Sequence, residues 1–178
     1  MKKEPTNLLT FDVEEFDLPL EYKIPISLEE QMETGRAGTI EIKKIIDSQQ
    51  ILTTLFTTAN FADHYPALIK ELAGNNEIAS HTDYHSSFTK ADLLQSKYRL
   101  EDITGKEVNG LRMPRFKKID IDWVKEAGYK YDSSVNPTYI PGRYNNLKVP
   151  RTVFKENDFT ILPVSVSATM RFPLFWMA

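Results

Sequence analysis

Short apolar runs alternate along the chain with longer stretches in which apolar residues recur every three or four positions. The short runs, rich in β-branched and aromatic residues, predict strands, and the longer stretches predict helices. Strands are expected at residues 7–11, 51–57, 77–80, 108–111, 129–131 and 159–166. Helices are expected at residues 38–48, 61–73, 89–103 and 119–127, with Asn60 and Thr89 as N-caps and Gly105 as a stop. This alternation predicts a parallel α/β fold, either a barrel or an open sheet.

Three stretches lack a clear period. Residues 18–36 carry two prolines and mixed charges, and we expect them to be irregular with at most one helical turn. Residues 136–151 are rich in Pro, Gly and Asn and predict a long loop. Residues 171–178 are apolar and have no stop signal, so the chain is expected to end within an element. We therefore expect a single domain over residues 1–178 whose last strands are missing.

The composition is that of a globular protein, since 41% of the 178 residues are hydrophobic and 26% are charged. A formal net charge of -3 offers no basic face, so nucleic acid is not an expected partner. The absence of cysteine excludes thiolate ligands, which leaves histidine and carboxylate for any metal. No apolar run is long enough for a signal-peptide core or a membrane span, so the sequence as it stands predicts a cytoplasmic protein. A chain whose export signal had been removed would look the same.

Two of the three histidines, His81 and His85, stand four positions apart directly after the strand predicted at 77–80. Two neutral imidazoles at this spacing can converge on one cation, and an acid from elsewhere would leave an open position for water. The alternative is that the segment is a polar loop in which the two histidines only form hydrogen bonds and bind no metal. Asp83 is expected to be a loop residue rather than a ligand, and His64 to make surface or capping contacts in a helical turn.

Charged side chains follow several of the predicted strands. Four acids between residues 12 and 17 follow the first strand, and Arg112 and Asp132 follow two later ones. In a parallel α/β fold these strand ends lie on one face, where such folds carry their chemistry. The alternatives are a solvated acidic loop, an ordinary ion pair at Arg112, and a turn at Asp132 formed with the two serines that follow it.

Taken together, four motifs occur in a characteristic order. They are Thr-Phe-Asp-Val-Glu at 10–14, Ser-His-Thr-Asp-Tyr-His at 80–85, Arg-Met-Pro-Arg-Phe at 112–116 and Asp-Ser-Ser at 132–134. In this order the chain closely resembles the polysaccharide deacetylase family, also called the NodB-homology or carbohydrate esterase type. The resemblance implies a distorted (β/α) barrel and a divalent metal, usually zinc, held by one acid and by His81 and His85.

The resemblance also implies roles for the other residues. Asp12 would be the base and Glu14 the metal ligand, although the reverse assignment also fits, and Glu15 is a weaker third candidate. Arg112 would pair with the base, a task that suits a bidentate guanidinium. Tyr84, Pro114 and Arg115 would bind substrate, since backbone N–H groups beside Tyr84 or beside Pro114 and Arg115 would stabilise the oxyanion. Asp132 would belong to the catalytic site. Histidine and carboxylate ligands suit zinc, cobalt, nickel and iron alike.

One departure from the family pattern concerns the histidine that the family places near its C-terminus to protonate the leaving amine. This chain has no histidine after His85.

The leading hypothesis is a metal-dependent hydrolase that removes acetyl groups from an N-acetylated amino-sugar polymer. The alternatives are a catalytically silent member that binds carbohydrate or metal, and a hydrolase of a small cyclic amide. An incomplete barrel that exposes Phe172, Leu174, Phe175 and Trp176 would favour a homo-oligomer.

Overall fold

A mostly parallel sheet forms the centre of the computed structural model, which describes residues 7–141 and 144–174. Its strands are β1 (Thr10–Val13), β2 (Thr54–Thr57), β3 (Glu77–Ser80), β4 (Gly110–Leu111), β5 (Tyr131–Asp132), β8 (Phe154–Glu156) and β9 (Phe159–Ile161). They lie in the order β1-β2-β3-β4-β5-β9-β8, with every pair parallel except the last. Among the described residues, β1 and β8 are therefore the two edges of a sheet that does not close. The expected parallel α/β fold is confirmed.

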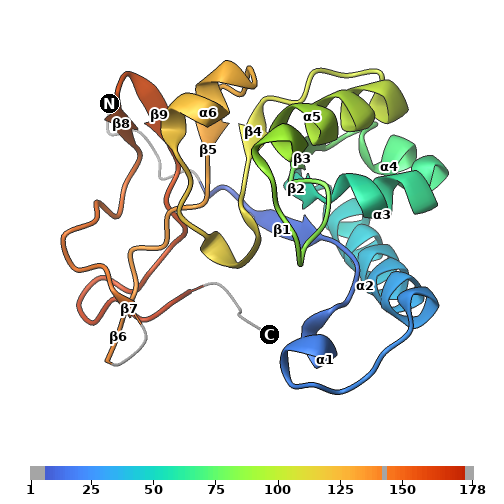
Figure 1. Ribbon diagram of the computed structural model, residues 1–178, viewed down its shortest axis with the longest axis horizontal. Helices are drawn as coiled ribbons and strands as arrows, with labels where there is room; N and C mark the ends of the chain where they lie inside the picture. Colours follow the sequence, from blue (N-terminus) through green and yellow to red (C-terminus); the bar gives the residue numbers. More distant parts are fainter. Residues whose placement is uncertain (1–6, 142–143, 175–178) are drawn as a thin grey trace.

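Helices cover one face of this sheet. The described helices are α1 (Leu18–Glu21), α2 (Leu28–Gln49), α3 (Ala59–His64), α4 (Pro66–Leu72), α5 (Lys90–Thr104) and α6 (Ile121–Glu126), with a 3-10 turn, η1, at Pro114–Phe116. The short α1 buries no residue. Figure 1 shows α2 to α5 gathered on one side of β1, β2 and β3. The buried core between the two layers includes Leu55 and Leu111 from strands and Phe61, Ile69 and Leu100 from helices. No helix in the described ranges is long and apolar enough to cross a membrane.

The helix expected at 38–48 begins ten residues earlier, at Leu28, so the prediction of an irregular stretch to residue 36 was wrong. Ser27 and Glu30 form a capping box that starts the helix. The pattern of hydrophobic positions did not indicate this start, because α2 buries only Gln31, Met32, Thr39 and Ile46, half of which are polar. Its inner face therefore carries a weak hydrophobic signal.

The helix expected at 61–73 is divided at Tyr65 into α3 and α4. Tyr65 precedes a proline, which disfavours the helical conformation, and it has φ −129° and ψ 55°. The cap is Thr58 rather than Asn60, since the Thr58 side chain accepts a hydrogen bond from the Phe61 N–H. The stop at Gly105 is confirmed, because this residue adopts the left-handed conformation at φ 67°.

The C-terminal third differs most from expectation. The predicted loop at 136–151 contains a two-stranded ribbon, β6 (Tyr139–Ile140) and β7 (Tyr144–Asn145), that lies away from the helices (Figure 1). The strand expected at 159–166 ends at Ile161 and pairs with β8, which was not predicted. Asn157 and Asp158 join the two with positive φ angles of 48° and 62°, as tight hairpin turns require. Of the apolar end expected at 171–178, the last four residues lie outside the described ranges.

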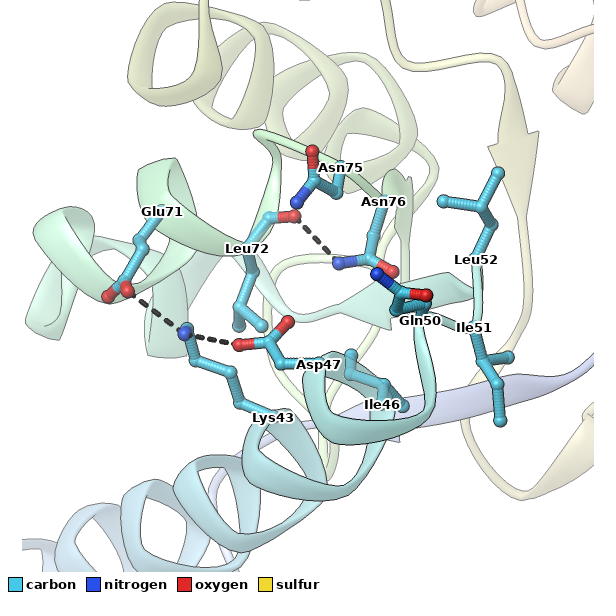
Figure 2. Close-up of a pocket in the computed structure, with 10 residues that line it drawn as sticks. All are labelled: Lys43, Ile46, Asp47, Gln50, Ile51, Leu52, Glu71, Leu72, Asn75 and Asn76. Carbon is cyan, nitrogen blue, oxygen red and sulfur yellow. Dashed lines mark hydrogen bonds and ion pairs between the residues drawn. The ribbon is translucent and has the colours of Figure 1, made fainter.

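A cavity of about 400 Å³ lies where α2 and α4 end, before β2 and β3 begin. Figure 2 shows interactions among its lining residues: Lys43 pairs with Asp47 at 2.7 Å and Glu71 at 2.9 Å, and the Asn76 side chain donates to the Leu72 backbone carbonyl at 3.0 Å. Because it borders the amino ends of the strands, this cavity is at the end opposite to the predicted site.

Candidate metal centre

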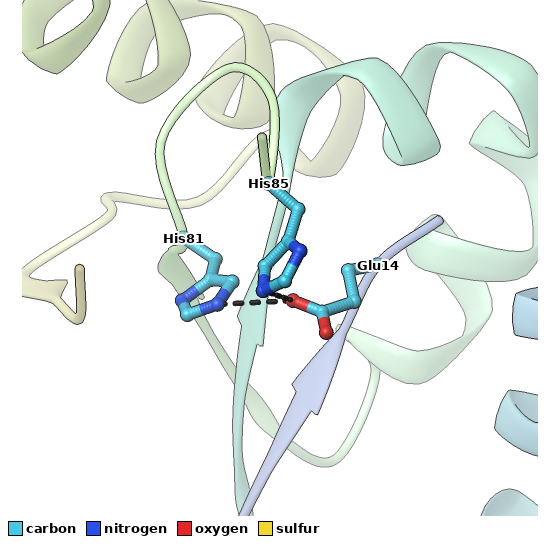
Figure 3. Close-up of side chains that lie close together, drawn as sticks. All are labelled: Glu14, His81 and His85. Atoms are coloured by element: carbon cyan, nitrogen blue, oxygen red, sulfur yellow. Dashed lines mark ion pairs between the residues drawn. The ribbon is translucent and has the colours of Figure 1, made fainter. Parts of the chain in front are cut away.

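Three predicted ligands meet at the carboxyl ends of β1 and β3. Glu14 directly follows β1, His81 directly follows β3, and His85 stands in the segment between β3 and α5. Glu14 Oε2 lies 3.0 Å from His81 Nε2 and 3.5 Å from His85 Nε2 (Figure 3). One ligand atom from each of the three residues falls within 4.8 Å of the others. The structure thus brings Glu14, His81 and His85 together, although the first two are 67 positions apart in the sequence.

The ring of His81 has a defined orientation. His81 is buried, and its backbone N–H donates to the Thr57 carbonyl at 2.9 Å. Its ring Nδ1 lies 2.7 Å from the Arg112 carbonyl. A carbonyl oxygen only accepts hydrogen bonds, so Nδ1 must carry the proton. In the neutral ring the lone pair therefore lies on Nε2, which faces Glu14.

His85 has the same tautomer for a different reason. Its Nδ1 lies 2.6 Å from Asp17 Oδ1, and a carboxylate at this site is an acceptor. Nε2 is again the nitrogen that faces Glu14. The two imidazole rings are nearly parallel, with centroids 5.8 Å apart and planes inclined by 22°.

These three groups fit a divalent cation. Glu14 Oε2 is buried without a hydrogen-bond donor and faces the Nε2 atoms of both histidines. Acceptors at such distances repel one another unless a cation or a proton lies among them. Tetrahedral zinc with ligand bonds near 2.0–2.1 Å would separate its ligand atoms by about 3.3 Å, which matches the observed distances. Burial lowers the pKa of His81, but the charges of Asp12 and Glu14 raise it more, so the pKa lies above 6.5 and the pocket attracts positive charge.

Asp12 lies beside this cluster and pairs with Arg112. The guanidinium donates to Asp12 Oδ1 at 2.7 Å and to the hydroxyls of Thr10 and Ser133, each at 3.0 Å. The Arg112 side chain is buried, whereas that of Asp12 is 32% exposed. Asp12 therefore keeps a fixed orientation while its carboxylate still reaches solvent.

Glu15 does not join the ligand cluster. Its Oε2 accepts from the Thr58 hydroxyl at 2.7 Å, and its Oε1 accepts from the His85 backbone N–H at 3.1 Å. Asp17, which the sequence analysis did not single out, contacts the imidazole ring of His85, whereas Glu15 contacts only its backbone. The only signal that could have found it was a further acid in the same run, and an acidic run is usually solvated.

Asp132 lies apart from the cluster. The strand register aligns it with Leu111 and Ile161, whose side chains belong to the core between sheet and helices. Its carboxylate accepts hydrogen bonds from the backbone and hydroxyl of Ser134, as in a side-chain turn. Burial raises the pKa of Asp132 to about 6, although the Ser134 hydrogen bonds and Arg112 lower it. This position supports the alternative of a turn former rather than a site residue.

The three residues expected to bind substrate have different positions. Tyr84 stands between the two histidines and is 44% exposed. Pro114 is buried and begins η1. Arg115 adopts a left-handed backbone conformation, φ 56°, and its guanidinium contacts His85 O, Asp17 and Glu21. Its side chain therefore connects loops around the cluster.

Comparison with known proteins agrees with this geometry. A model of the polysaccharide deacetylase family matches residues 2–131. A Mycobacterium smegmatis protein assigned to the polysaccharide deacetylases is 20% identical, with a TM-score of 0.62 over 90% of this chain and 58% of its own. PuuE allantoinase, 19% identical, and a Pseudomonas aeruginosa PAO1 protein assigned to the polysaccharide deacetylases, 17% identical, both have TM-scores of 0.54 over 74% of this chain and 44% of theirs. No curated protein matches the sequence significantly.

These structural likenesses confirm the expected fold, a distorted barrel that is incomplete in the described residues. The chain spans less than two thirds of the length of each of these solved proteins.

Proposed function

Because the chain belongs to the polysaccharide deacetylase family, we propose that it removes N-acetyl groups from an amino-sugar polymer or oligosaccharide with a divalent metal held by Glu14, His81 and His85. The observation that carries this proposal is the buried Glu14 Oε2, which has no hydrogen-bond donor and faces two imidazole lone pairs. Zinc is the metal that fits this donor set best, and cobalt, nickel and iron fit the same donors.

The bound metal would supply an acidified water and polarise the acetyl carbonyl. Asp12 is the proton acceptor in this proposal, since its carboxylate is partly exposed beside the cluster. Arg112 fixes the Asp12 carboxylate through Oδ1 and is itself fixed by Thr10 and Ser133. Backbone N–H groups at Tyr84 or Arg115 would donate to the oxyanion of the tetrahedral intermediate.

A second candidate is a member that binds metal but has little or no activity. The observation that favours it is that residues 86–178 contain no histidine, the residue type that the family uses to protonate the leaving amine. Hydrolysis of a small cyclic amide is a third candidate, and its support is the fold that the chain shares with an allantoinase. Both alternatives keep the same three ligands.

The test combines metal content with acetate release. We expect one zinc per wild-type chain after reconstitution, and no stoichiometric zinc after His81→Ala combined with His85→Ala. His64→Ala is the matched control, because the His64 ring contacts the Asn60 carbonyl and the Tyr65 ring and does not belong to the ligand cluster. Undiminished zinc in the double variant would contradict the proposed centre.

Acetate release from an N-acetylated glucosamine oligomer then separates the candidates. Zinc with acetate release supports the deacetylase. Zinc without release supports the inactive member, and hydrolysis of allantoin without acetate release supports the cyclic amidase.

We also propose self-association through the apolar C-terminal segment. Phe172 and Leu174 are 53% and 67% exposed, while Phe175 and Trp176 lie outside the described residues. Sedimentation of the chain before and after Phe172→Ser with Leu174→Ser measures this, and identical sedimentation of the two proteins would contradict it.

A further inference from the structure

The two histidines of the cluster are held in different ways. His81 directly follows a strand, and its backbone N–H and ring Nδ1 both bind backbone carbonyls, those of Thr57 and Arg112. His85 lies four residues further on, in a segment without helix or strand. Its orientation must therefore come from side chains of other segments.

Three charged side chains hold His85. Glu15 Oε1 accepts from the His85 backbone N–H at 3.1 Å, Asp17 Oδ1 lies 2.6 Å from ring Nδ1, and Arg115 Nη1 donates to the His85 carbonyl at 3.0 Å. The backbone donor, the backbone acceptor and one ring nitrogen of a single residue are thus all engaged. We refer to Glu15, Asp17 and Arg115 as the His85 clamp.

The members of the clamp also support one another. Arg115 Nη2 lies 3.3 and 3.4 Å from the two oxygens of Asp17, and Glu15 accepts a second hydrogen bond from Thr58 at 2.7 Å. Glu15 and Asp17 are only 4% and 3% exposed. Burying a carboxylate is unfavourable unless it is fully paired. Both carboxylates here are paired, and each accepts one of its hydrogen bonds from His85.

We propose that Asp17 is a positioning residue which, with Glu15 and Arg115, fixes the tautomer and direction of His85 so that its Nε2 faces the cation. This inference rests on the proposed metal centre. A carboxylate that accepts from the distal nitrogen of a metal-binding histidine orients the ring and increases its basicity, and loss of such a partner usually lowers metal affinity 10- to 100-fold. Asp17 does not itself belong to the ligand cluster.

The first measurement is the zinc dissociation constant of the purified chain, determined by competition with a chelating dye. We expect Asp17→Ala to weaken zinc binding about 10- to 100-fold and Asp17→Asn to weaken it less, because the amide oxygen can still accept from Nδ1. The matched control is Asp83→Asn. Asp83 is a similarly buried carboxylate in the same segment as His85, but it pairs with Arg99, 2.7 Å away, and is outside the cluster.

The second measurement reads the tautomer directly in the zinc-free chain. Because the sequence has only three histidines, long-range proton–nitrogen NMR spectra at pH 8 can resolve each ring. In the wild type we expect His85 to carry its proton on Nδ1. In Asp17→Ala we expect a shift toward the Nε2-protonated form, while His81, held by the Arg112 carbonyl, provides an internal reference.

The outcomes distinguish failure of the role of Asp17 from failure of the proposed metal centre on which it rests. A wild-type chain that binds no zinc overturns both the proposed metal centre and the role of Asp17 at it. Zinc binding by the wild type that is equally tight in Asp17→Ala, with an unchanged His85 tautomer, overturns the role of Asp17 alone. Equal weakening by Asp83→Asn also overturns it, because the effect would then come from general loosening of the segment.

Discussion

Arg112 and Asp12, one hundred positions apart in the sequence, form a 2.7 Å ion pair beside the candidate metal centre. The Arg112 guanidinium also stacks on the ring of Phe56, with its central carbon 4.0 Å from the ring centroid. Stacking and three hydrogen bonds hold the guanidinium in one orientation. The hydrogen bond from Arg112 to Asp12 Oδ1 in turn fixes the orientation of the Asp12 carboxylate. The pair therefore places a fixed carboxylate next to a cluster of metal-type ligands.

Replacing Asp12 by Asn tests whether this carboxylate acts as the base. We expect zinc binding to be retained and acetate release to fall at least 100-fold, since general base catalysis is typically worth 100- to 10,000-fold. Zinc stoichiometry and acetate release are measured on the same preparation. Loss of the metal instead would mean that the ligand and the base are exchanged between Asp12 and Glu14.

Replacing Arg112 by Lys tests the guanidinium itself. An ammonium cannot form the forked set of bonds to Asp12, Thr10 and Ser133, nor can it stack flat on Phe56. We expect a loss of stability of about 2–4 kcal/mol in urea unfolding, because a buried network is broken. Lys90→Arg, at a surface ion pair with Glu126, is the control and should change stability by less than about 0.5 kcal/mol. Equal effects of the two substitutions would argue against the network.

Gly35 bears on the position of Glu14, although it lies in the middle of α2. A Cβ on Gly35 would come well within 3.0 Å of the Glu14 carbonyl oxygen, so the helix packs directly against the backbone of a predicted ligand. In an open helix position Gly→Ala stabilises by about 1 kcal/mol. We expect Gly35→Ala to do the opposite, lowering both stability and zinc affinity because Glu14 must move.

The same helix offers a matched control for this prediction. A Cβ on Gly38 would meet no atom within 4 Å, so Gly38→Ala should stabilise the chain by roughly 0.5–1 kcal/mol and leave zinc affinity unchanged. Thermal unfolding and zinc competition compare the two variants. If Gly35→Ala behaved like Gly38→Ala, the close approach of α2 to Glu14 would not constrain the ligand.

The ligand cluster could be predicted from the sequence because its parts are local or follow from a simple rule. His81 and His85 stand four apart after an apolar run, and the acids of residues 12–17 follow the first run, so parallel strands bring them to one edge. The choice of Glu14 among these acids came from the family resemblance. The strands themselves were visible because their residues are buried in short β-branched runs. The start of α2 was not visible, since that helix buries few apolar side chains.

Other features depend on packing between distant segments, which no local pattern encodes. Asp17 and His85 are 68 residues apart, and nothing near either residue indicates their contact. The face on which Asp132 lies follows from its register with Leu111, and a shift of one residue would reverse it. The sequence therefore predicted which residue types gather at the strand ends, but not which of them face the cluster.

The raised pKa of Asp132 predicts how the free energy of unfolding changes with pH. Burial raises its pKa from 3.8 to about 6, so between these values the folded chain binds a proton that the unfolded chain has lost. The stability contributed by this group is therefore fully present below pH 3.8 and is lost as the pH rises through about 6. Asp132→Asn removes this dependence and keeps an oxygen that can accept from Ser134. Its stability relative to the wild type should rise between pH 4 and pH 7.5, by up to about 3 kcal/mol at about 1.4 kcal/mol per pKa unit.

Urea unfolding of both proteins at pH 4.0, 5.5 and 7.5 measures that difference, and parallel curves would contradict a raised pKa. Acetate release by the same variant tests the role of the residue. If Asp132 forms a turn behind the sheet, Asp132→Asn keeps its activity at every pH where it is folded. If activity disappears while the fold and the zinc affinity persist, Asp132 takes part in catalysis as the order of the motifs suggested, and its carboxylate must then act on the site from the face that the helices cover.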